Sequence, residues 1–173
     1  EAARRVCEGE LRQVLARDQM DLDQAAYIEM IRGKTAELCS VACRLGGAFS
    51  GGSDAQVDAL STYGDALGIA FQIADDYLDL WGDAEKWTLP VLRLRETASP
   101  SVARRVDAAL CGESQARHRL LMPLLNASDA REYTKLTAIH YRDLACDALR
   151  VLPESASKHS LVELATFAID RTF

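Results

Sequence analysis

Residues 64–83, GDALGIAFQIADDYLDLWGD, indicate both the fold class and the chemistry of the chain. If a helix covers about residues 54–81, each residue advances about 100° around its axis. One third of the circumference then carries Asp65, Gly68, Gln72, Asp75, Asp76, Asp79 and Asp83. The opposite face carries Leu67, Phe71, Ala74, Tyr77, Leu78 and Trp81. The stretch therefore predicts a long amphipathic helix whose polar stripe is almost entirely carboxylate.

The acidic stripe lacks the basic neighbours that usually offset charge on a solvated helix face. No Lys or Arg occurs between Arg44 and Lys86, whereas eight acidic residues do. Crowded carboxylates repel one another unless a cation lies among them. Asp75, Asp76 and Asp79 therefore predict a divalent-cation site, and hard oxygen ligands of this kind favour Mg²⁺. A plain solvated face is the alternative interpretation.

The remainder of the chain indicates an all-α protein. Its 173 residues suit one domain. It contains 4 Pro and 10 Gly and no Asn-Gly or Asp-Gly hairpin turn, while Ala and Leu, both strong helix formers, dominate. We expect helices over residues 2–19, from a cap at Asp21 or Asp23 to 49, from a cap at Asp54 to 81, and over 100–112, 114–125, 129–152 and 157–172. A short segment, 87–92, follows the acidic helix. The expected architecture is a single bundle of long, mostly antiparallel helices around a central cavity.

Composition also excludes several classes of function. The net charge of -6 disfavours binding to a phosphate backbone, so we expect no nucleic-acid partner. No uncharged apolar run of about 18 residues exists, so we expect no membrane span. The odd number of cysteines, five, favours free thiols in a reducing cytoplasm. Cys39 and Cys43 share a helix face without nearby histidines, which favours a small-residue helix contact over a metal site.

A lysine interrupts the apolar stripe of the second expected helix. Lys34 lies in the middle of the face formed by Tyr27, Met30, Ile31, Leu38, Val41 and Leu45. An ammonium buried without a partner is costly. Lys34 is therefore either a side chain whose head reaches water or one that projects into a cavity to meet an anion, with the Thr35 hydroxyl beside it. A diphosphate bridged by Mg²⁺ to the aspartates would satisfy both the carboxylates and the lysine.

Four segments carry a resemblance to a known family. GIAFQIADDYLD (68–79) resembles the second aspartate-rich motif of the trans-type polyprenyl diphosphate synthases, which elongate isoprenoid chains. YIEMIRGKTAELCSVACRLGGAFSG (27–51) resembles the Lys-Thr helix of that family, and WTLPVLRL (87–94) its Thr-Leu-Pro segment. The C-terminal YRDLACDALRVLPESASKHSLVELATFAIDR (141–171) is similar to the end of family members. The resemblance covers the whole chain but only the second half of a family member.

The resemblance implies an isoprenoid-synthase bundle and a prenyl transfer. Mg²⁺ would draw off the diphosphate of an allylic substrate, and the double bond of isopentenyl diphosphate would attack the resulting carbocation. By matching position, Asp75, Asp76 and Asp79 would hold Mg²⁺. The allylic diphosphate would be bound by Lys34, Thr35 and Gln72. Lys86 is a candidate for a further diphosphate-binding lysine. The family also implies a homodimer.

The chain departs from the family pattern in two places. The first aspartate-rich motif has no counterpart, since Arg4, Arg5 and Arg12 have no adjacent aspartate cluster. The loop that family members carry before the Thr-Leu-Pro segment is shortened, because residues 83–86 run directly into Trp87. These departures leave open a non-catalytic or half-site subunit of a heteromeric synthase. A class I terpene cyclase is less favoured, because its Asn/Ser/Glu metal motif is not found.

We expect residues 1–173 to be the C-terminal portion of a larger all-α domain, because one aspartate cluster cannot ionise the substrate by this mechanism. A fragment, or a subunit whose partner supplies the other half, would also explain the single cluster. Intact-mass measurement of the purified protein tests the expectation of a longer chain. A mass well above 19.0 kDa is expected, and a mass near 19.0 kDa would contradict the expectation.

Overall fold

The computed structural model of the chain describes residues 2–16, 22–83, 88–112 and 114–170, and their regular elements are all helical. In chain order these are α1 (Ala2–Ala16), α2 (Gln24–Ile31), the π-helix η1 (Arg32–Ala36), α3 (Glu37–Phe49), α4 (Asp54–Asp83), α5 (Leu89–Thr97), α6 (Pro100–Leu110), α7 (Ser114–Asn126), α8 (Ala130–Ala148), the 3₁₀-helix η2 (Leu149–Val151) and α9 (Ala156–Asp170). The all-α prediction is confirmed. Residues 17–19 and 171–172 of the expected helices lie outside the described residues.

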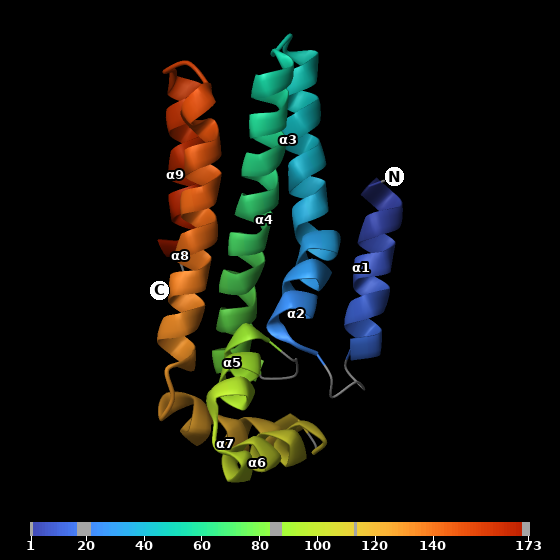
Figure 1. Ribbon diagram of the computed structural model, residues 1–173, viewed down its shortest axis with the longest axis vertical. Helices are drawn as coiled ribbons and strands as arrows, with labels where there is room; N and C mark the ends of the chain where they lie inside the picture. The colour runs from blue at the N-terminus through green and yellow to red at the C-terminus, as the bar shows by residue number, and fades with distance from the viewer. Residues whose placement is uncertain (1, 17–21, 84–87, 113, 171–173) are drawn as a thin grey trace.

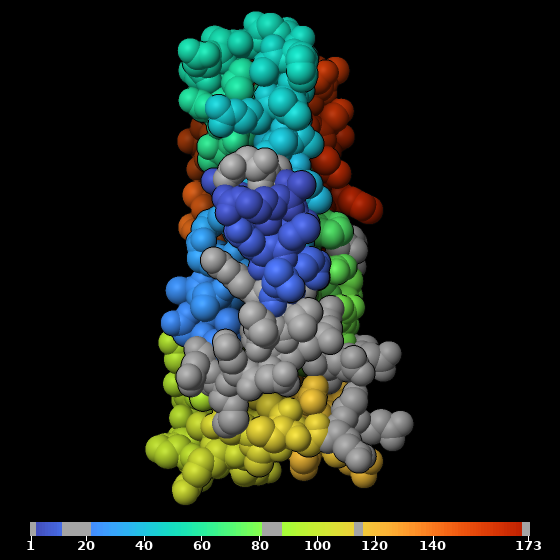
Figure 2. Space-filling view, turned by 90° about the vertical axis from the view of Figure 1, so that its right-hand side faces the viewer, coloured from blue at the N-terminus to red at the C-terminus, as the bar shows by residue number. Residues whose placement is uncertain are grey.

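Helix α4 stands in the middle of the bundle (Figure 1). It contacts η1 and α3 on one side and α8 and α9 on the other. Helix α1 packs against η1 and lies across the face seen in Figure 2, while α6 and α7 lie across one end of the bundle. Among the described helices, none combines the length and the hydropathy needed to cross a bilayer.

Short polar residues start the helices that form the site. The carboxylate of Asp23 caps α2 by accepting the backbone N–H three residues ahead, at 2.7 Å, as one of the two predicted caps. The predicted cap of α4, Asp54, is instead its first helical residue. Ser53 caps α4 with Gln56, since each side-chain oxygen accepts the backbone N–H of the other residue, at 2.9 and 3.4 Å. This reciprocal capping box satisfies two backbone donors that the helix itself leaves unpaired.

The π-helix rotates the second half of the predicted apolar stripe out of the core. Tyr27, Met30 and Ile31 are buried as expected, but Leu38 and Leu45 are 53% and 48% exposed. A π-helix places more residues in one turn than an α-helix does. Residues before and after η1 therefore do not share the face that a regular α-helix would give them.

Small and polar residues of α3 face α4 in place of the leucines. The Ser40 hydroxyl donates to the backbone oxygen of Ser61 at 2.9 Å. Gly47 is buried, and Cys43 packs against a core cluster that includes Tyr63 of α4. These contacts agree with a small-residue helix contact at Cys39 and Cys43.

Two glycines of α4 allow its close approach to η1 and α3. A Cβ added to Gly64 would lie 2.5 Å from the backbone oxygen of Cys39, and one added to Gly68 would lie 2.5 Å from the Cα of Ala36. Both distances are shorter than van der Waals contact, and both neighbours are backbone atoms. Thr35, which precedes Ala36, is held against α4 by this approach.

Helix α4 buries part of its polar stripe and exposes part of its apolar face, contrary to a simple amphipathic pattern. Gln72 and Asp76 are 8% and 4% exposed, whereas Phe71 and Leu78 are 40% and 41% exposed. The reason is its central position, because neighbouring helices cover α4 on more than one side. Which residues of α4 are buried therefore depends on several packed helices and not on a single core-facing stripe.

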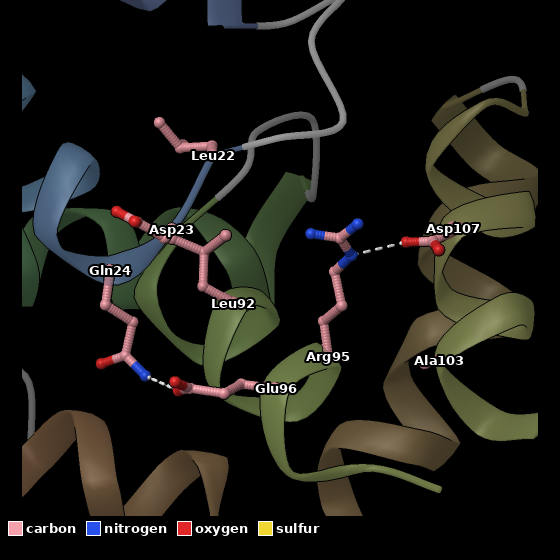
Figure 3. Close-up of a pocket in the computed structure, with 8 residues that line it drawn as sticks. All are labelled: Leu22, Asp23, Gln24, Leu92, Arg95, Glu96, Ala103 and Asp107. Atoms are coloured by element: carbon pink, nitrogen blue, oxygen red, sulfur yellow. Dashed lines mark hydrogen bonds and ion pairs between the residues drawn. The ribbon is translucent and has the colours of Figure 1, made fainter. Parts of the chain in front are cut away.

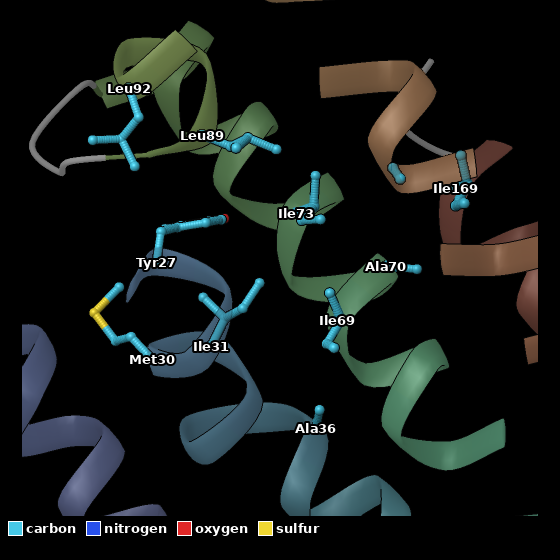
Figure 4. Close-up of a cluster of buried hydrophobic side chains, with 11 residues drawn as sticks. Tyr27, Met30, Ile31, Ala36, Ile69, Ala70, Ile73, Leu89, Leu92 and Ile169 are labelled. Carbon is cyan, nitrogen blue, oxygen red and sulfur yellow. The ribbon is translucent and has the colours of Figure 1, made fainter. Parts of the chain in front are cut away.

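In the part of the chain that the structure describes, the core consists of three clusters of buried side chains that follow one another along the bundle. The cluster nearest the predicted site joins α2, η1, α4, α5, α8 and α9 (Figure 4). Its buried members are Tyr27, Met30, Ile31, Ala36, Ile69, Ala70, Ile73, Leu89, Leu92, Ala138 and Ile169. Burial of this apolar surface holds α2 and η1 in place beside α4.

All five cysteines are unbridged, which confirms the free-thiol prediction. Cys7 and Cys111 are exposed, whereas burial raises the pKa of Cys39, Cys43 and Cys146. A raised pKa lowers the thiolate fraction at a given pH, and the thiolate is the reactive form.

Limited alkylation at pH 8 followed by peptide mass spectrometry is therefore expected to label Cys7 and Cys111 first. The three partly buried thiols, Cys39, Cys43 and Cys146, should be modified at similar rates only after unfolding in denaturant. Rapid labelling of Cys39 or Cys43 in the native protein would contradict the packing of α3 on α4.

Substitution of Gly68 by alanine tests the close approach of α4 to η1. Overpacking against backbone is expected to lower the free energy of unfolding by about 1–3 kcal/mol. Gly46→Ala is the matched control, because a Cβ at Gly46 meets nothing within 4 Å. This control should stabilise the helix by about 0.5–1 kcal/mol. Urea unfolding followed by circular dichroism measures both, and equal effects of the two substitutions would contradict the packing described.

Candidate functional site

A chain of hydrogen bonds joins α2, η1 and α4 at the predicted site. The Thr35 hydroxyl donates to Oε1 of Gln72 at 2.6 Å. The Gln72 amide nitrogen donates to Oδ1 of Asp76 at 2.8 Å, and the Tyr27 hydroxyl donates to Oδ2 of the same carboxylate at 2.8 Å. Three of the residues predicted from sequence, Thr35, Gln72 and Asp76, are thus brought into one connected group.

The three aspartates of the motif lie in different environments. Asp76 is 4% exposed, Asp75 is half-buried and Asp79 is exposed. Adjacent residues of a helix point about 100° apart, whereas residues four apart lie on the same face. Asp75 and Asp79 therefore share a face, and Asp76 points into the interface with α2.

Tyr27 is a site residue that sequence reasoning assigned only to the apolar face. Its side chain is completely buried, and Figure 4 shows it extending from α2 toward α4. Burial is the main cause that raises its pKa well above the usual value, and the charge and hydrogen bond of Asp76 raise it further. The hydroxyl therefore keeps its proton and acts as a hydrogen-bond donor.

Lys34 lies in η1, and its side chain is 24% exposed. Its Nζ atom is 3.5 Å from a carboxylate oxygen of Glu10 on α1. The backbones of α1 and η1 approach closely here. A Cβ added to Gly9 would lie 2.5 Å from the backbone nitrogen of Lys34. Glu10 is a second residue of the site that sequence reasoning missed.

Part of the acidic stripe is compensated by a basic residue from another helix. Nε of Arg32 lies 3.3 Å from the carboxylate of Asp65, and the Arg32 guanidinium also contacts Glu29. The absence of local lysines and arginines is thus partly offset by an arginine that is distant in sequence. Asp65 belongs to this ion pair, two helical turns before the Gln72–Asp76 segment.

The donor chemistry at Asp75 and Asp79 fits a magnesium ion. Mg²⁺ in proteins commonly binds one or two carboxylates, several waters and substrate phosphates. Two carboxylates one turn apart on a helix match that donor set. Within the described residues, no group of three or more His, Cys, Asp or Glu side chains forms a metal-binding cluster. Lys86, the predicted second diphosphate lysine, lies outside the described residues.

Two cavities lie near the site without including its predicted residues. One, of about 350 Å³, is formed by α5, α6 and the start of α2 (Figure 3). Arg95 donates to Asp107 across it at 2.8 Å, and Gln24 donates to Glu96 at its opposite side. The other cavity, of about 480 Å³, lies between α2 and α8 and is mostly apolar. In the first cavity, the polar side chains mainly bond to one another.

Comparison with known proteins agrees with this geometry. The family model described as polyprenyl synthetase matches residues 1–117. A short chain isoprenyl diphosphate synthase of Methanothermobacter thermautotrophicus is 31% identical in an alignment of 180 positions, which covers 96% of this chain and 55% of that protein. The octaprenyl diphosphate synthase of Escherichia coli is 33% identical in an alignment of 187 positions, which covers 99% of this chain and 57% of that protein.

Solved structures show the same likeness in three dimensions. A decaprenyl diphosphate synthase from Rhodobacter capsulatus superposes with a TM-score of 0.91 at 32% identity, over 99% of this chain and 57% of that one. A polyprenyl synthase from Caulobacter crescentus, complexed with calcium and isoprenyl diphosphate, gives 0.87 at 34% identity, again over 99% and 57%. The chain spans slightly more than half the length of these relatives. Sequence and fold together place the chain in the polyprenyl synthetase family.

Proposed function

We propose that the chain is the C-terminal part of a Mg²⁺-dependent prenyltransferase that condenses isopentenyl diphosphate with an allylic diphosphate. The observation that carries this proposal is the contact between η1 and the acidic segment of α4. It connects the Lys-Thr pair to the aspartate motif through the 2.6 Å bond from Thr35 to Gln72. Membership of the polyprenyl synthetase family and the relative bound to calcium and isoprenyl diphosphate support it.

The aspartate motif of α4 would hold the metal ion, and Asp75 and Asp79, which lie one helical turn apart, would supply carboxylate ligands. When bound, Mg²⁺ would neutralise charge on the leaving diphosphate and so favour cleavage of the allylic C–O bond. The double bond of isopentenyl diphosphate then forms the new C–C bond, and loss of a proton completes the product. Gln72 and Thr35, adjacent to the carboxylates, would position the substrate.

Lys34 would bind the diphosphate of the allylic substrate in exchange for its contact with Glu10. The Glu10 side chain is 52% exposed, and an exposed carboxylate binds an ammonium weakly. A diphosphate carries more charge and more acceptor oxygens than one carboxylate. Substrate binding is therefore expected to displace Glu10 from Lys34.

A half-site subunit of a heteromeric synthase is the second candidate, because residues 1–173 carry one aspartate-rich motif. A cytoplasmic homodimer is the assembly that we propose for the enzyme. Its support is an unburied apolar row on α3, formed by Leu38, Leu45 and Phe49, which are 53%, 48% and 87% exposed. A contiguous exposed apolar patch is a common mark of a site that contacts another protein surface.

Product analysis tests the proposed reaction. The protein in its natural full-length form, given Mg²⁺, an allylic diphosphate and isopentenyl diphosphate, is expected to release longer prenyl diphosphates. Activity that appears only after a partner protein is added would favour the half-site subunit. No chain growth under either condition would contradict the proposal.

Asp75→Ala is expected to lower kcat by about 10²–10³, the usual cost of removing one group that stabilises transition-state charge. Asp58→Ala is the matched control, because Asp58 is an exposed aspartate earlier on the same helix. The control should leave steady-state kinetics unchanged. If Asp75→Ala retains full activity, the acidic stripe of α4 is only a solvated face.

A further inference from the structure

We propose that Asp76 and Tyr27 are positioning residues, and that the Asp76 carboxylate orients Gln72 and Thr35 instead of binding the metal ion. The proposal rests on the proposed function and deepens it, because it separates the roles of the three aspartates. It assigns metal binding at this motif to Asp75 and Asp79.

The first argument is the environment of the Asp76 carboxylate. One of its oxygens accepts from Tyr27 and the other accepts from Gln72, each at 2.8 Å. The residue is 4% exposed, while Asp79 is exposed. Mg²⁺ dehydrates reluctantly and usually keeps several waters. A carboxylate buried between a tyrosine and a glutamine leaves little room for a hydrated ion.

The second argument is the direction of the hydrogen bonds. An ionised carboxylate only accepts, so Gln72 must turn its amide N–H toward Asp76. The Gln72 carbonyl oxygen then points to Thr35, and a carbonyl also only accepts. Thr35 must therefore donate its proton to Gln72, at 2.6 Å. The charge of Asp76 thus determines which way both the amide and the hydroxyl point.

The third argument is the anchoring of this arrangement by Tyr27. Its ring lies in the buried cluster with Met30 and Ile31, so the hydroxyl cannot leave Asp76 without disturbing the core (Figure 4). Two buried partners in different helices hold the carboxylate from both sides. An oriented group of this kind keeps reacting atoms aligned, and small displacements at such positions reduce rates strongly.

The test compares two tyrosines that are equally buried. Tyr27→Phe removes the hydroxyl that holds Asp76. Tyr63→Phe is the control, because Tyr63 is also 0% exposed and donates one 2.8 Å hydrogen bond, to the backbone oxygen of Leu161 away from the site. Both variants should lose similar thermal stability. Only Tyr27→Phe is expected to lower kcat, by about 10- to 100-fold, with little change in KM.

Metal binding is measured separately. Mn²⁺ is titrated into the full-length protein with inorganic diphosphate present, and electron paramagnetic resonance monitors the free and bound Mn²⁺. Asp75→Asn should weaken Mn²⁺ binding at least about tenfold, as loss of a ligand does. Asp76→Asn should keep Mn²⁺ binding near wild type but lose activity, because its amide cannot accept from both Tyr27 and Gln72.

Two results would overturn the proposal. Equal loss of Mn²⁺ affinity in Asp76→Asn and Asp75→Asn would make Asp76 a metal ligand. Unchanged kcat in Tyr27→Phe, as in Tyr63→Phe, would leave Tyr27 a purely structural residue. If the wild-type protein binds Mn²⁺ but transfers no prenyl group, the proposed reaction fails, while the Mn²⁺ titrations still decide the role of Asp76.

Discussion

The close approach of α4 to η1 is the constraint on which the site depends. Gly68 has no Cβ, and a Cβ there would collide with the backbone of Ala36. Because the backbones meet there, Thr35 can reach Gln72 one turn further along α4. A larger residue at this position would separate the Lys-Thr pair from the aspartate motif, although both motifs would still be present in the sequence.

Packing around α4 also explains why its acidic residues differ in chemistry. A central helix has no single outer face, so some of its polar positions become interfaces. Asp76 is such a position, and it is satisfied by neutral donors from within the fold. Asp65 is compensated by Arg32, which comes from a neighbouring segment. Asp79 remains exposed. Position on the helix thus determines how each carboxylate is compensated.

Most of the helices could be predicted from local sequence, because caps, glycine breaks and apolar spacing act within a few residues. The expected end of the second helix near residue 49 and the cap at Asp23 agree with the structure. Three features could not be predicted locally. The π-helix of η1, the exposure of Leu38 and Leu45, and the burial of Asp76 all depend on which helices pack together. Tyr27 had a detectable signal, since a buried tyrosine hydroxyl usually has a partner, but its partner lies 49 residues away.

The separation of the site residues along the chain has a consequence for folding. The bond from Gln72 to Asp76 spans one helical turn, so it can form as soon as α4 exists. The bonds from Thr35 and Tyr27 to α4 span 37 and 49 residues. Contacts of such long range form only after the chain between them has closed into a loop. The aspartate motif can therefore be helical early in folding, whereas its final side-chain arrangement is acquired only when α2 and η1 dock against α4.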